Sequence, residues 1–147
     1  MNRPTQRILM LLAVAWAAAG LHLRAAAEPL PEPEAQKVRE VIVAQLSALA
    51  LDDADKAFET ATPEVRAAIG TPTRFLALVR AAYPMVYRPA SVSFHRPEQE
   101  DGGVLQMVEI RDDDDKAWLA LFALERQPDQ SWRISGCVVA ENHWQTT

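Results

Sequence analysis

Few side chains in this sequence have the type and spacing that catalysis or metal binding requires. His95 and His143 are the histidines that follow the N-terminal apolar segment, and neither belongs to a His-x-His or His-Glu-x-x-His pattern. His95 falls in an expected strand, where it could face Glu109 on the adjoining strand and form a general acid and base pair. We favour an exposed histidine at a sheet edge, because about half of a strand's side chains face water.

Acidic residues gather at two places, and each place has a structural explanation. Asp52, Asp53 and Asp55 stand at a helix junction, where a carboxylate inside a pocket could serve as the general base of an isomerase-like site. Helix capping and interaction with the helix dipole explain the same residues without chemistry and are favoured. Asp112–Asp115 is a run of four aspartates. A calcium loop alternates its oxygen ligands and carries a glycine, so a solvated hairpin turn is expected instead.

The nucleophilic residue types give no stronger signal. None of the serines after residue 27 stands in a Gly-x-Ser-x-Gly elbow, so nucleophilic hydrolysis is unsupported. Cys137 is the single cysteine, and one thiol cannot close a disulfide within its own chain. Its apolar strand predicts a small buried hydrophobe, with an intermolecular disulfide or a reactive thiol as the alternatives. The sequence therefore predicts no catalytic residue, no metal site and no cofactor.

A second group of side chains has the chemistry of a ligand wall. Four of its members are aromatic side chains with one polar group, and the fifth is an arginine next to one of them. Three follow the last expected helix, and two lie on expected strands. They are Tyr83, Tyr87, Arg88, Trp118 and Trp132. Such aromatics suit the rim of a binding pocket. They suit an ordinary core as well, and the core is the favoured interpretation, so these five residues are candidates for ligand binding only.

Length and charge limit the classes of protein that could carry these residues. The chain has 147 residues, of which 49% are hydrophobic, enough for one domain with its own core. All 20 acidic residues follow residue 27, together with 12 of the 15 basic ones, so that part has a net charge of −8. An acidic domain without basic clusters repels phosphate backbones and anionic lipid surfaces. Binding to nucleic acid or to a membrane surface is therefore not expected.

The first 27 residues have the pattern of an export signal. Two arginines precede an unbroken run of small and apolar residues, Ile8–Leu21, and Ala25 and Ala27 supply the small side chains that a signal peptidase reads. Cleavage is predicted between Ala27 and Glu28. The alternative is a retained membrane anchor, but a helix of 14 residues rises about 21 Å, short of the roughly 30 Å hydrocarbon core. A periplasmic or secreted location is expected, without a stable membrane anchor after cleavage.

The segment after the expected cleavage site divides into a linker and a helical region. Residues 28–34 read Glu-Pro-Leu-Pro-Glu-Pro-Glu, and the alternating prolines predict an extended, solvated linker. Helical spacing of apolar residues predicts a helix over 35–51, with Gln45 and Leu46 on the apolar stripe. Capping residues predict three shorter helices: 54–61 after Asp53, 63–69 between Thr62 and Gly70, and 72–82 after Thr71.

The C-terminal half changes to the alternation that is typical of strands. The connections are too short for parallel crossovers, so the strands are expected to pair antiparallel. The strand over 117–127 is apolar on both faces, which predicts a central strand covered by helices on one side and by a partner, a ligand or sheet curvature on the other. The fold is expected to be α+β: N-terminal helices on a curved antiparallel β-meander, in one domain over 35–147. Extended segments are predicted over 86–88, 91–96, 104–111, 117–127 and 132–141.

Several stretches, taken in order, resemble a bacterial family described as a domain of unknown function, number 4864. They include Tyr83-Pro84-Met85-Val86-Tyr87-Arg88-Pro89, Trp118-Leu119-Ala120-Leu121-Phe122-Ala123-Leu124-Glu125 and Trp132-Arg133-Ile134-Ser135-Gly136-Cys137. The order of helices and meander is also similar to the nuclear transport factor 2-like (cystatin-like) superfamily. That resemblance implies a cone-shaped pocket between a bent sheet and a long helix. Its members include isomerases, dehydratases and binding modules, so it implies a fold rather than an activity.

Three functions are compatible with this sequence. The favoured one is a non-catalytic exported module that binds a small apolar ligand or a protein partner, with a homodimer through the sheet as one form of it. The first alternative is an isomerase- or dehydratase-like enzyme that uses a pocket carboxylate or His95. The second alternative is an accessory protein of cell-envelope assembly.

Overall fold

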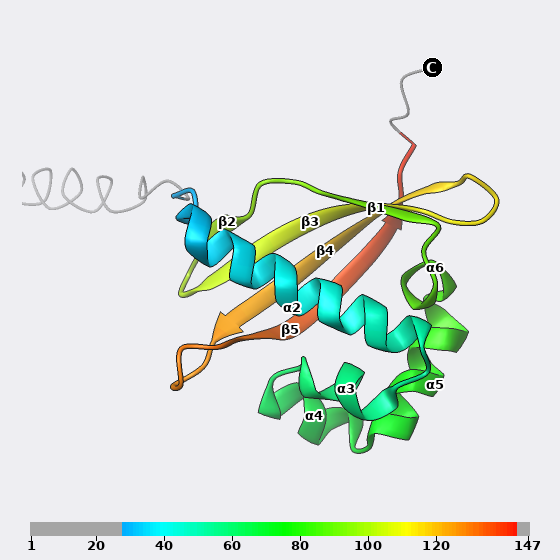
Figure 1. Cartoon of the computed structure of the whole chain (residues 1–147), viewed down its shortest axis with the longest axis horizontal. Coiled ribbons are helices and arrows are strands. Elements are labelled where there is room, and N and C mark those ends of the chain that lie inside the picture. The colour runs from blue at the N-terminus through cyan, green and yellow to red at the C-terminus, as the bar shows by residue number, and fades with distance from the viewer. Residues whose placement is uncertain (1–27, 144–147) are drawn as a thin grey trace, which may run out of the picture.

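The computed structural model describes residues 28–143, which form a set of helices followed by one open antiparallel sheet (Figure 1). The expected α+β class is therefore confirmed. The predicted export signal and the Ala27 side of its cleavage site lie outside the described residues. The helices are α2 (Glu32–Ala50), α3 (Ala54–Glu59), α4 (Pro63–Ile69), α5 (Pro72–Ala82) and α6 (Pro84–Tyr87). The strands are β1 (Ser91–Phe94), β2 (Glu98–Glu100), β3 (Gly103–Arg111), β4 (Ala117–Arg126) and β5 (Trp132–Glu141).

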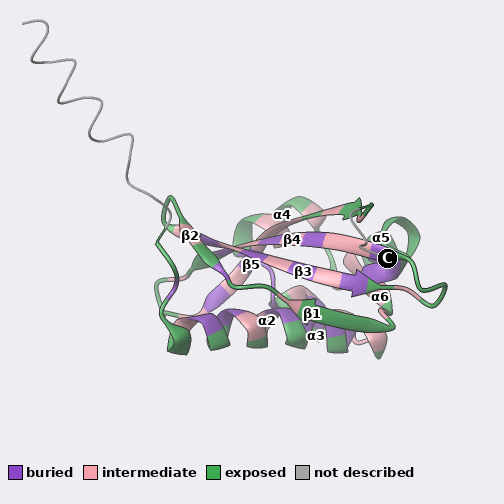
Figure 2. Cartoon of the chain, turned by 90° about the horizontal axis from the view of Figure 1, so that it is seen from above, coloured by how far each residue is buried: buried purple, intermediate pink, exposed green. Residues whose placement is uncertain are grey.

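Helix α2 lies across one face of the sheet (Figures 1 and 2). Its apolar stripe is buried, with Val38, Ile42 and Leu49 fully enclosed. The helix begins at Glu32, inside the segment predicted to be an extended linker, because a proline is tolerated in the first helical turn and acidic residues there complement the helix dipole. Leu30 is also buried. The segment before the helix therefore packs on the domain instead of standing in solvent.

Side-chain caps start three of the shorter helices, as the sequence predicts. Asp53 accepts a hydrogen bond from the Lys56 backbone N–H at 3.2 Å, and the Thr62 and Thr71 hydroxyls accept the corresponding bonds of α4 and α5. Helix α4 ends at Gly70, whose φ of 102° lies in the left-handed region that favours glycine. These helix ends follow from local chemistry alone.

The stretch after α5 differs from the prediction. An extended segment was expected over 86–88, but the chain forms the short helix α6. Pro84 ends α5 because it has no backbone N–H to donate, and the same property suits it to the first turn of a new helix. Met85 and Val86 on this turn are buried in the core. Burial of these two side chains accounts for the helix in place of a strand.

The sheet has the order β1-β3-β4-β5, and β2, which lies between the extended segments predicted over 91–96 and 104–111, pairs with β3. All pairings are antiparallel, and β4 is central, as predicted. Burial alternates along β3 and β4 (Figure 2): Val108, Ala120 and Phe122 face α2 and are fully buried, while their sequence neighbours stay partly exposed. The core therefore lies between α2 and this inner face of the sheet.

Among residues 28–143, no helix combines the length and the apolar character that crossing a bilayer requires.

Candidate functional site

An apolar cavity of about 190 Å³ lies between the helices and β5. Helix α4 contributes Val65 and Ile69, α5 contributes Phe75 and Val79, and β5 contributes residues from Ile134 to Val139. Each wall uses the apolar face of an amphipathic element, so the cavity is a place where these faces meet without filling the space between them. A cavity of this size and lining accepts a small apolar molecule; one on the order of 150 Å³ in another protein binds benzene.

One polar side chain, Gln45 of α2, lines this cavity while being only 5% exposed. Its amide nitrogen Nε2 donates to Thr60 Oγ1 at 2.9 Å. The Thr60 hydroxyl donates its own proton to the Ala57 carbonyl at 2.6 Å, so Thr60 Oγ1 is free only to accept. This relay fixes the orientation of the Gln45 amide. The carbonyl oxygen Oε1 accepts no hydrogen bond from any residue between 28 and 143, and this oxygen keeps some accessible surface.

Cys137 of β5 also lines the cavity, and its environment fixes its chemical state. Burial raises the pKa of the thiol to about 12, because the charged thiolate loses its hydration. The thiol is therefore neutral at physiological pH and is a poor nucleophile. This agrees with the favoured prediction of a small hydrophobe. In the cavity Cys137 supplies apolar, polarizable surface.

Of the five ligand candidates chosen from the sequence, Tyr83 lines the cavity. Tyr87 and Arg88 lie together outside it and bind the end of α2: the Tyr87 hydroxyl donates to Asp52, and the Arg88 guanidinium donates to the same carboxylate at 3.4 Å. The hydrogen bond to Asp52 raises the pKa of Tyr87. Asp52 therefore anchors α6 to α2 instead of facing a pocket.

Trp118 is held in the β3–β4 hairpin. Its indole N–H donates to Asp112 at 3.0 Å, and this bond lowers the pKa of the Asp112 carboxyl. The other Asp112 oxygen accepts from the backbone N–H groups of Asp114 and Lys116, which builds the predicted turn. The aspartate run thus closes a hairpin, and Trp118 is part of that turn's hydrogen bonding.

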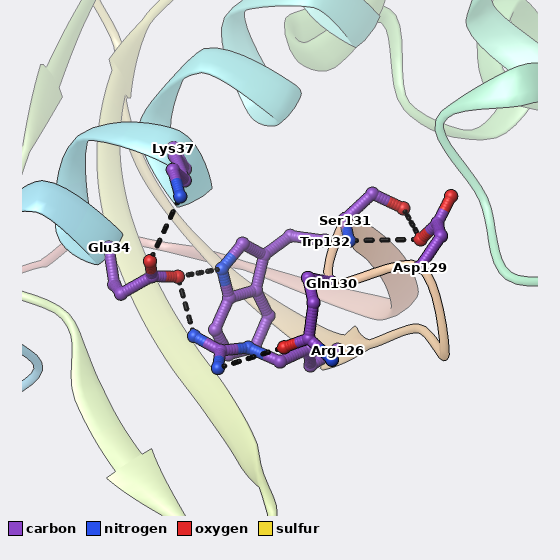
Figure 3. Close-up of polar contacts among 7 residues, drawn as sticks. All are labelled: Glu34, Lys37, Arg126, Asp129, Gln130, Ser131 and Trp132. Atoms are coloured by element: carbon purple, nitrogen blue, oxygen red, sulfur yellow. Dashed lines mark hydrogen bonds and ion pairs between the residues drawn. The ribbon is translucent and has the colours of Figure 1, made fainter.

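Trp132 belongs to a cluster centred on Glu34 of α2 (Figure 3). The Glu34 carboxylate accepts from Trp132 Nε1 at 2.9 Å, from Arg126 Nη2 at 2.6 Å and from Lys37 Nζ at 3.1 Å. These donors, the Trp132 indole first, lower the pKa of Glu34 to about 2. The carboxylate already accepts hydrogen bonds from three side chains. We therefore assign it a structural role: it connects α2 to the β4–β5 hairpin.

An open groove runs beside this cluster. It is larger than the apolar cavity, about 1120 Å³, and is lined by acidic side chains, among them Glu28, Glu98, Glu100 and Asp101. An open groove leaves its polar groups hydrated, so a small ligand gains little by entering it. The wall of the cavity at Gln45 is mostly apolar, which suits a small apolar ligand better.

His95 and Glu109 meet on the sheet, as the sequence predicts, with His95 Nε2 and Glu109 Oε2 3.2 Å apart. Both side chains are nearly half exposed, and neither lines the apolar cavity.

Asp53 caps α3, and Asp55 lies in the first turn of that helix. Among residues 28–143, no three histidine, cysteine or acidic side chains gather closely enough to hold a metal ion. Asp52, Asp53, Asp55 and His95, the residues considered for catalysis, therefore do not share a cavity.

The outer face of the sheet carries a largely apolar surface. The members lie on β3, β4 and β5, alternate with the buried inner residues, and are paired side by side in the sheet. They are Leu105, Met107, Leu119, Leu121, Ala123, Val138 and Ala140. Val138 is 69% exposed. We call these seven residues the outer apolar face.

Sequence reasoning missed Gln45 as a site residue, although a signal was present. Gln45 occupies a position on the apolar stripe of α2, where a polar residue is exceptional. A buried polar side chain requires a hydrogen-bond partner, and the sequence does not show that Thr60 occupies one end of the amide and leaves the other end open. The cavity itself depends on how five elements meet, which no local pattern encodes.

These features define the class as a small α+β protein in which helices cover one face of an antiparallel sheet. The chain belongs to the family Domain of unknown function (DUF4864), whose sequence profile matches residues 31–147. This confirms the family that the sequence motifs resemble. No curated protein and no solved structure matches the chain.

Proposed function

We propose that this protein is a non-catalytic binding module that takes a small, mostly apolar ligand into the cavity between its helices and β5. The single observation that carries this proposal is the cavity of about 190 Å³, walled mainly by apolar side chains from four elements, α4, α5, α6 and β5. An apolar ligand gains free energy from leaving water and costs the protein no rearrangement of charges. The isomerase-like alternative gains no support, because the considered carboxylates and His95 lie outside this cavity.

Binding of p-xylene to the purified domain tests this proposal. We expect saturable binding by calorimetry and a rise in melting temperature, because a ligand at a hundredfold excess over its Kd stabilises a native state by about 2.7 kcal/mol. The variant Val65→Phe fills the cavity from α4 and should abolish binding. Val43→Phe is the matched control, since Val43 lies on α2, is 43% exposed and does not line the cavity. Equal binding to wild type and Val65→Phe, or failure of the wild type to bind both p-xylene and its hydroxyl analogue p-cresol, would contradict the proposal.

We propose as a second function that the outer apolar face binds a second copy of the chain. Three strands of nine or ten residues span on the order of 14 by 30 Å. That is roughly 400 Å² of flat area, and the relief of the side chains increases it toward the about 800 Å² per partner of a standard interface. Because each copy is acidic, two copies can approach most closely at an uncharged surface. The outer apolar face meets that condition over most of its extent; Glu109, which pairs with Leu119, is the charged side chain beside it and contacts His95 and Asn142.

Sedimentation of the wild type and two variants tests the dimer. Val138→Glu places a charge on the outer apolar face at an exposed position, so it should give a monomer without loss of folding. Leu51→Glu is the matched control, because Leu51 is 80% exposed and follows α2, away from the sheet. We expect the wild type and Leu51→Glu to sediment as dimers. A monomeric wild type, or a Val138→Glu variant that remains dimeric, would count against this function.

We propose further that the protein works in the periplasm or outside the cell, where its leader directs it, and that its fold is of the nuclear transport factor 2-like type. An interior cavity between a long helix and an antiparallel sheet supports that fold type. Cell-envelope assembly stays an alternative role for the same surfaces.

A further inference from the structure

The apolar cavity contains one polar group that is set up to receive a ligand. Gln45 is 95% enclosed, and its Nε2 is held by Thr60 at 2.9 Å. Its Oε1 accepts no hydrogen bond from the part of the chain that the structure describes. Rotation of the amide by about 180° would not give Oε1 a hydrogen-bond donor. It would place Oε1 against Thr60 Oγ1, whose proton is already committed to Ala57 O at 2.6 Å.

We infer that the ligand of this cavity carries one hydrogen-bond donor, a hydroxyl or an N–H, on a small apolar body, and that Gln45 Oε1 accepts from it. This inference rests on the proposed function of the cavity. The remaining wall supplies no charged side chain. Its other hydrogen-bonding groups are the weak thiol of Cys137 and the phenol of Tyr83, a residue that is 41% exposed. The site therefore favours a neutral molecule over an acid or an amine.

The cavity volume limits the size of that molecule. A space of about 190 Å³ holds a single ring with one or two short substituents, given that on the order of 150 Å³ holds benzene. The ligand class is thus a neutral, monocyclic or short-chain alcohol, phenol or N–H compound. A site built to accept from a donor discriminates against the analogue that lacks it, because that analogue displaces water from the acceptor without replacing its hydrogen bond.

Two probes of equal shape test the donor requirement: p-cresol, which carries a hydroxyl, and p-xylene, which has a methyl group in its place. Their absolute affinities also reflect hydration in water, so the informative quantity is the change in each Kd when Gln45 is replaced. In Gln45→Met we expect p-cresol to bind about tenfold more weakly, while p-xylene binds as it does to the wild type. Gln36→Met makes the same chemical change on the exposed side of α2 and should alter neither affinity.

A measurement on the wild type covers the case in which Gln45→Met does not fold. The side-chain ¹³Cδ resonance of Gln45 should shift when p-cresol binds and stay in place with p-xylene, because a hydrogen bond to the carbonyl polarises it. Binding of both probes with equal responses at Gln45, or with equal losses in Gln45→Met, would overturn the donor requirement and leave the proposed function standing. Failure of both probes to bind the wild type would overturn the proposed function itself, and the inference with it.

Discussion

Glu34 connects three structural elements through one side chain. Its carboxylate joins the first turn of α2 to Arg126 at the end of β4 and to Trp132 at the start of β5 (Figure 3). The side chain is 22% exposed, so water screens part of the charge interaction. The lowered pKa nevertheless shows that the folded protein favours the ionised carboxylate.

The pH dependence of stability should report this carboxylate directly. Glu34 has a pKa of about 2 in the folded protein against an ordinary value of 4.5. Its contribution is therefore present above pH 4.5 and is lost as the pH falls toward 2. We expect Glu34→Gln to melt below the wild type at pH 6, and the gap in melting temperature to narrow by pH 2. Glu32→Gln, in the same helical turn, is the control. A gap that stays constant with pH would exclude the assigned role.

The same residue-scale view explains which site predictions the sequence could support. Aromatics with polar tips were chosen as ligand contacts because of their chemistry, but Tyr87, Trp118 and Trp132 each find a carboxylate of the chain itself. Two of these partners are distant in sequence, 35 positions for Tyr87 and 98 for Trp132. A sequence pattern cannot show that the polar group of an aromatic side chain already has a hydrogen-bond partner within the chain. It also cannot show that the Gln45 carbonyl lacks one.

At the scale of elements, the capping residues determine where the short helices begin. Thr62 is 1% exposed, and its hydroxyl accepts from the Val65 N–H at 3.3 Å. Its own backbone N–H donates to Ile134 O at 3.0 Å, so the cap also joins α4 to β5 at the edge of the cavity. Thr71 performs the same capping for α5 at an exposed position. The two residues form a natural pair for comparison.

Removal of each hydroxyl should separate capping from burial. We expect Thr62→Ala to lower the free energy of unfolding by about 1–2 kcal/mol and Thr71→Ala by about 0.5–1 kcal/mol, measured by urea denaturation. Thr62→Ser keeps the hydroxyl while removing the buried methyl group, and it should recover part of the loss. If Thr62→Ser were as unstable as Thr62→Ala, the methyl group rather than the cap would be responsible.

Element predictions succeeded where the deciding chemistry is local and failed where it is tertiary. The caps at Asp53, Thr62 and Thr71 and the antiparallel strands follow from residue types and short connections. Helix α6 and strand β2 have four and three residues, too few for a periodic signal. Helix α6 is fixed by burial of Met85 and Val86, and β2 by pairing with β3. Both causes lie outside the segments themselves.

At the scale of the whole molecule, the two faces of the sheet have different surroundings. The inner face packs on α2 and, beyond the β5 edge of the core, leaves the cavity at Gln45. The outer apolar face is partly exposed along β3 and β4 and open at Val138. A central strand that is apolar on both sides serves both surfaces at once. Ligand binding on one side and pairing of copies on the other are therefore compatible in one molecule.

The proposed location outside the cytoplasm depends on removal of the predicted leader, residues 1–27. We expect protein recovered from the periplasm to begin at Glu28 by intact-mass measurement, since Ala25 and Ala27 are the small residues that a signal peptidase reads. Ala27→Arg should block cleavage and leave the full-length chain in the membrane fraction. Ala26→Arg introduces the same charge at the position between them, which is not read, and should be processed normally. Equal processing of both variants, or an unprocessed wild type in the cytosol, would exclude the predicted leader.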